Sequence, residues 1–80
     1  MAEPDTYDLR GLKCPLPVMR ARKRLAALAP GDRVWLETTD PLAVIDIPAF
    51  CQQEGHRLLE TVATSDGHRF LVEKGMPASE

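Results

Sequence analysis

No apolar run in this sequence is long enough to cross a bilayer, and no cationic excess marks it as a nucleic-acid-binding protein. Lysine and arginine number 10 against 12 aspartates and glutamates, for a net charge of −2. The 80 residues suffice for one small two-layer core and leave no room for a second catalytic domain. We therefore expect a monomeric single domain over residues 1–80, with an ordered core over about residues 6–75 and no direct contact with membranes or nucleic acid.

Cysteine is also scarce, since only Cys14 and Cys51 are present and they fall in different predicted elements. A lone structural disulfide is unusual in a reducing compartment, so we interpret both side chains as thiols. The first five residues are acidic and have no apolar core of the kind that a secretory or organellar leader needs. We therefore expect a cytoplasmic protein.

The first half of the chain shows strand, helix and strand patterns in turn. Residues 6–9 and 33–38 are rich in β-forming types, and a helical crossover between them predicts that the two strands are parallel. Residues 15 to about 29 repeat apolar side chains at helical spacing, at Val18, Ala21, Leu25 and Leu28.

A second helix is predicted to begin at Asp40, which suits a capping position, with Pro41 in the first turn. Pro48 would interrupt a continuous helix, so we expect a break there and a restart with Asp46 as a second cap. Gly55 is typical of a helix end.

Residues 56–64 and 68–73 then predict two strands joined by the short turn Ser-Asp-Gly at 65–67, which is an antiparallel hairpin. The resulting fold class is an α/β two-layer sandwich of order β-α-β-α-β-β, a mixed four-stranded sheet with both helices packed on one face. Residues 76–80 are expected to be loose. Core positions are predicted for the aromatic side chains Tyr7, Trp35, Phe50 and Phe70.

Cys14 is the candidate functional residue, because it stands at the predicted helix start in the sequence Cys-Pro-Leu-Pro. With Cys14 as the cap, Pro15 and Pro17 occupy the first and third helical positions, where a missing N–H costs little and the fixed φ stiffens the site. Pro17 also stands where a dithiol oxidoreductase has its second cysteine, so a sulfur atom held on Cys14 would not be discharged by a neighbour. This disfavours thiol-disulfide exchange.

The surroundings of the thiol are predicted to stabilise a thiolate. The N–H groups of Leu16 and Val18 and the positive end of the helix dipole lie near the sulfur, and Lys13 and Arg10 add cationic charge. We therefore expect the Cys14 pKa to be lowered. The structural alternative is a small inert cap in a rigid turn, but cysteine is a weak helix cap compared with serine, aspartate or asparagine.

The run Asp-Leu-Arg-Gly-Leu-Lys-Cys-Pro-Leu-Pro-Val at 8–18 strongly resembles the signature of the TusA family, also called SirA-like sulfur carriers, whose hallmark is Cys-Pro-x-Pro. Further similar blocks are Pro-Gly-Asp at 30–32, Asp-Pro at 40–41, Asp-Ile-Pro at 46–48, Phe-Cys at 50–51 and residues 70–75. The resemblance runs from about Tyr7 to Gly75 and implies the same β-α-β-α-β-β sandwich.

The resemblance further implies that Cys14 carries sulfur as a persulfide, with Pro15, Leu16, Pro17, Lys13 and Arg10 as its supporting residues. Family members receive sulfur from a cysteine desulfurase or a rhodanese and pass it to DsrE-type proteins. Their routes end in transfer-RNA thiolation, in molybdenum cofactor metabolism or in the oxidation of reduced sulfur. Such a carrier takes part in sulfur transfer without being a stand-alone catalyst, and no cofactor or metal is implied.

Four cations, at positions 20 and 22–24, follow the cysteine along the first helix. We interpret Arg20, Lys23 and Arg24 as a docking surface for an acidic partner, because complementary charge speeds encounter. An ordinary solvated helix face is the plain alternative. A regulatory or RNA-binding module that uses this basic helix is the alternative function.

The second cysteine and the two histidines are interpreted as structural. Cys51 follows Phe50 on the second helix, where a free cysteine behaves as a small buried apolar residue. His56 and His68 stand at strand edges without metal-ligand spacing to either cysteine, so we expect no metal site.

Overall fold

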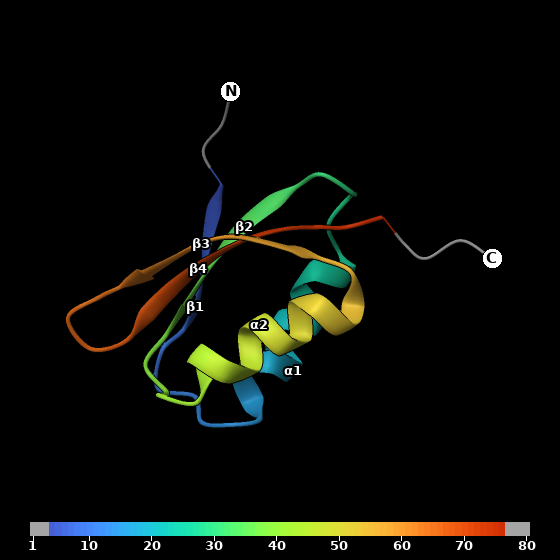
Figure 1. The fold of residues 1–80 in the computed structure, drawn as a ribbon. Helices are drawn as coiled ribbons and strands as arrows, with labels where there is room; N and C mark the ends of the chain where they lie inside the picture. Colours follow the sequence, from blue (N-terminus) through green and yellow to red (C-terminus); the bar gives the residue numbers. More distant parts are fainter. Residues whose placement is uncertain (1–3, 77–80) are drawn as a thin grey trace.

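The computed structural model describes residues 4–76, which form a four-stranded sheet with two helices on one face (Figure 1). The elements are β1 (Asp5–Leu9), α1 (Leu16–Ala26), β2 (Arg33–Thr38), α2 (Ala43–Glu54), β3 (Arg57–Ala63) and β4 (His68–Glu73). The strand order is β1-β2-β4-β3, with β1 parallel to β2 and the other pairs antiparallel. The predicted fold class is therefore confirmed. Residues 77–80 of the tail expected to be loose lie outside the described range.

The core lies between the sheet and the helices. Alternate residues of β2 and β4 point toward the helices and are fully buried, which is the period-two pattern of a sheet covered on one face. Each fully buried large side chain contributes about 1.5–3 kcal/mol. The buried apolar residues are Leu9, Ala21, Leu25, Val34, Leu36, Ala43, Ile47, Phe50, Cys51, Phe70 and Val72, and Tyr7 packs against them.

Trp35 does not face this core, so that prediction is wrong. Its neighbours Val34 and Leu36 are buried, and alternation places Trp35 on the opposite face of the sheet. There the guanidinium of Arg69 stacks 4.4 Å from the Trp35 ring centroid. The charged residues at 33 and 37 lie two positions before and after Trp35, so all three share one face of the strand. These charges were the signal in the sequence that assigned position 35 to the polar face.

The first helix starts later and ends earlier than predicted. Pro15 is the capping residue and Pro17 is the second helical residue, so Cys14 lies in the turn before the helix. The helix ends at Ala26, and the N–H of Leu28 donates to the Leu25 carbonyl in a tighter final turn, 3.1 Å.

The predicted break at Pro48 is wrong, because α2 is continuous from Ala43 to Glu54 with the proline inside it. Pro48 has no N–H for the Val44 carbonyl, but Val44 is exposed and water can serve that acceptor. Gly55 ends the helix as predicted, with φ of 77°. Within residues 4–76 neither helix has the length and apolar character needed to span a membrane.

Candidate functional site

Cys14 lies in the loop that connects β1 to α1, and its side chain is exposed. Two hydrogen bonds fasten this loop to the segment that follows β2. The N–H of Gly11 donates to Oγ1 of Thr39, 2.9 Å, and the N–H of Cys14 donates to Oδ2 of Asp40, 2.7 Å. Because β1 and β2 are parallel neighbours, their carboxyl ends meet at one edge of the sheet and bring these segments together.

Asp40 connects the starts of both helices. While Oδ2 accepts from Cys14, Oδ1 accepts from the N–H of Leu42, 3.2 Å, and the Asp40 carbonyl accepts from the N–H of Ala43, 3.0 Å. Leu42 is the capping residue of α2, so Asp40 closes the turn before the helix and is not the cap itself. Its bond to Cys14 was missed from the sequence, although its place directly after a parallel strand was a usable signal.

The environment raises the pKa of Cys14, so the prediction of a lowered pKa is wrong. The Asp46 carboxylate, as a hydrogen-bond acceptor for the thiol, is the main cause, followed by desolvation and by the negative charges of Asp46 and Asp40. The N–H of Leu16, expected to face the sulfur, instead donates to the Lys13 carbonyl, 2.8 Å. The resting side chain is therefore a neutral thiol at neutral pH.

Arg10, one of the two cations expected beside the sulfur, is engaged elsewhere. Its Nε and Nη2 donate to the two carboxylate oxygens of Asp8, at 2.9 and 3.0 Å. This bidentate pair, with a further bond from the Arg10 N–H, lowers the Asp8 pKa to about 2 and raises the Arg10 pKa. Arg10 therefore orders the end of β1 and does not activate the thiol.

Two of the four cations on α1 are held by contacts within the chain. The Arg24 guanidinium lies 5.1 Å from the Tyr7 ring centroid and 3.8 Å from the Asp5 carboxylate. Arg22 pairs with Glu54 at 3.5 Å. These contacts tie α1 to β1 and to α2, and they reduce the free basic surface that an RNA-binding helix would need.

The other two cations, Arg20 and Lys23, are exposed and form no ion pair within residues 4–76. Lys13 is exposed in the loop and likewise has no ion pair in that range. Within residues 4–76, these three side chains are the cations of the reactive loop and of α1 that remain available to a partner.

Cys51 is buried on α2, as predicted, and burial raises its pKa to about 11. A buried neutral thiol is a poor nucleophile, so Cys51 is unsuited to resolving a disulfide or persulfide on Cys14. In the described part of the chain, no three His, Cys, Asp or Glu side chains gather as a metal ion would require.

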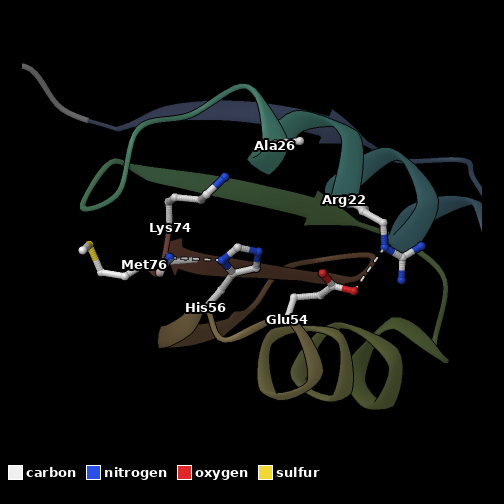
Figure 2. Close-up of a pocket in the computed structure, with 7 residues that line it drawn as sticks. Arg22, Ala26, Glu54, His56, Lys74 and Met76 are labelled. Atoms are coloured by element: carbon white, nitrogen blue, oxygen red, sulfur yellow. Dashed lines mark hydrogen bonds and ion pairs between the residues drawn. The ribbon is translucent and has the colours of Figure 1, made fainter. Parts of the chain in front are cut away.

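A hollow of about 200 Å³ lies at the C-terminal ends of the helices, away from Cys14 (Figure 2). Polar groups that line this hollow form hydrogen bonds within the protein. Nζ of Lys74 donates to the Leu25 carbonyl at 2.6 Å, and Nδ1 of His56 accepts from the N–H of Gly75 at 3.1 Å. Burial and the nearby Lys74 charge lower the His56 pKa, with Glu54 opposing them.

Comparisons with known proteins bear on the family and the fold of this chain. The family described as sulfurtransferase TusA has a profile that matches residues 5–74. Two candidate sulfur carrier proteins, from Neisseria meningitidis serogroups A and B, are each 50% identical to this chain over 68 residues, which cover 85% of this chain and 90% of the relative. The crystal structure of a SirA-like protein from Desulfitobacterium hafniense matches with a TM-score of 0.75 at 26% identity, over 90% of this chain and 99% of that one.

Proposed function

This chain belongs to the TusA family of sulfur carriers, and we propose that it holds the transferred sulfur as a persulfide on Cys14. The supporting observation is the contrast between the two cysteines, since Cys14 is exposed in an anchored loop and Cys51 is buried. A single accessible thiol without a resolving partner retains a persulfide until an acceptor protein takes the sulfur.

In the loading step, the Cys14 sulfur attacks the outer sulfur of a persulfide on the donor protein. The new bond joins Cys14 to that sulfur, and the donor's own sulfur–sulfur bond breaks. The donor cysteine leaves as a thiolate and takes up a proton, so that one thiol and one persulfide exchange places. No external oxidant or reductant is needed.

Asp46 is the proposed acceptor of the proton that Cys14 gives up, because its carboxylate is the main cause of the raised pKa of this thiol. The same interaction keeps the resting thiol protonated and suppresses its reaction with small oxidants. Loading is therefore favoured when a donor brings its persulfide directly to the sulfur.

The proposed donor is a cysteine desulfurase or a rhodanese, and the proposed acceptor is a DsrE-type protein. The product is thiolated transfer RNA, molybdenum cofactor or oxidised sulfur, according to the acceptor. The carrier acts as a cytoplasmic monomer in this proposal, and its exposed cations Arg20 and Lys23 steer an acidic partner toward Cys14.

The test is to incubate the protein with a cysteine desulfurase and L-cysteine, or with a rhodanese and thiosulfate, and to measure intact mass. We expect an adduct of about 32 Da that reduction removes. Cys14→Ser should abolish the adduct, and Cys51→Ser should retain it. Failure of both donors to load the wild-type protein would refute the proposal.

A further inference from the structure

Exposed apolar side chains gather around the reactive loop. Among residues 4–76, eight large apolar side chains are exposed, and five of them lie at the starts of the two helices, four in the first turns and Leu42 at the cap of α2. The other three are Leu59 and Val62 on β3, and Met76. We call the five the apolar collar: Leu16 (41% exposed), Met19 (53%), Leu42 (50%), Val44 (41%) and Ile45 (64%).

The geometry of the site brings the two halves of the collar to the same end of the molecule. The hydrogen bond from the Cys14 N–H to Asp40 joins the loop before α1 to the turn before α2. Ile45 is the neighbour of Asp46, whose carboxylate raises the pKa of the Cys14 thiol. Figure 1 shows both helices running in the same general direction from this end of the sheet.

The fold itself does not use these side chains. On α2, Ile47 and Phe50 are buried, whereas Ile45 points away from them and is the most exposed member of the collar. On α1, Ala21 is buried and Met19 lies on the outer side. Single exposed apolar residues are common on monomers, but a group of five around one reactive residue is typical of an interaction surface.

We propose that the apolar collar is the docking surface for the protein that exchanges sulfur with Cys14, an inference that rests on the proposed function. The partner presents an apolar patch around its reactive cysteine and acidic side chains at the edge of that patch. Charge indicates the acidic edge, because Arg20 and Lys23 follow Leu16 and Met19 by four residues, one helical turn further from the site. An apolar centre with a charged rim is the usual anatomy of a protein interface.

The experiment measures sulfur transfer from a cysteine desulfurase, charged with L-cysteine, to the intact carrier. Met19→Gln and Ile45→Gln should each lower the second-order rate of Cys14 loading by about tenfold, as for residues at the centre of an interface. The matched control is Val62→Gln, an exposed apolar position on β3, and it should load at the wild-type rate. Loading of Cys14 by small inorganic polysulfide should be the same in all four proteins.

The salt dependence of the loading rate distinguishes the contribution of the apolar collar from that of the basic residues Arg20 and Lys23. Loss of rate in a double variant, Arg20→Ala with Lys23→Ala, should shrink at high ionic strength, whereas the loss in the Met19 and Ile45 variants should persist. Wild-type rates in both collar variants, or an equal loss of rate in the Val62 control, would overturn the proposed docking role of the apolar collar while leaving the carrier function intact. If the desulfurase and a rhodanese both fail to load the wild-type protein, the proposed function is overturned, and the collar with it.

Discussion

Asp40 provides the sharpest test of how the fold positions Cys14. Its carboxylate accepts one backbone hydrogen bond from Cys14 at 2.7 Å and another from Leu42 at 3.2 Å. Replacing Asp40 by Ala removes both acceptors and leaves the two N–H groups to water. The start of α2 and the reactive loop should then both loosen.

The magnitude follows from these two bonds. The hydrogen bond from the Leu42 N–H, which closes the turn before α2, contributes about 1 kcal/mol. The bond to the loop is charge-assisted but partly exposed, which also corresponds to about 1 kcal/mol. Asp40→Ala should therefore lower the free energy of unfolding by about 2 kcal/mol, or the melting temperature by about 8 to 16 °C in a domain of this size. Asp40→Asn keeps one side-chain oxygen and should lose about half as much.

The assay is urea unfolding at neutral pH together with the pH profile of Cys14 alkylation. Asp66→Ala, in the exposed turn between β3 and β4, is the matched control and should change stability by less than about 0.5 kcal/mol. Both Asp40 variants lack the negative charge that raises the Cys14 pKa, so both alkylation midpoints should move to lower pH. A stability of Asp40→Ala equal to that of the control variant would refute the anchoring role.

Three further predictions concern the thiol and the far end of the helices. Asp46→Asn removes the negative charge that raises the Cys14 pKa and keeps only a neutral amide oxygen as acceptor, so the midpoint of iodoacetamide alkylation should fall; an unchanged midpoint would exclude this contact. The His56 pKa is lowered in the folded state, so stability present above the ordinary pKa of about 6.5 should be lost as pH falls through the lowered value. Urea unfolding as a function of pH should show a flatter profile for His56→Gln, and parallel profiles would contradict this assignment. A Cβ at Gly75 would collide with the backbone oxygen of Gly55, so Gly75→Ala should lower the free energy of unfolding by about 1–3 kcal/mol; a wild-type urea midpoint would show that the approach is not close.

Local sequence patterns predicted the helices and strands well because the preferences that form them act between residues close in the chain. Alternation and turn residues predicted the bounds of β2 and β4 as the structure has them, and Gly55 marked the end of α2. Two of the wrong structural predictions, at Pro48 and Trp35, came from treating one residue type as decisive. At Pro48 a single lost hydrogen bond was outweighed by the packing of Ile47 and Phe50.

The sequence by itself determined the order of elements, the placing of one cysteine between the first strand and the first helix, and the family to which Cys-Pro-x-Pro belongs. Only the tertiary structure decided what surrounds the sulfur. Asp40 and Asp46 lie 26 and 32 residues beyond Cys14, so no local pattern relates them to the thiol. The parallel pairing of β1 with β2 brings them to it, and their proximity reverses the pKa shift that the adjacent cations and helix dipole had led us to expect.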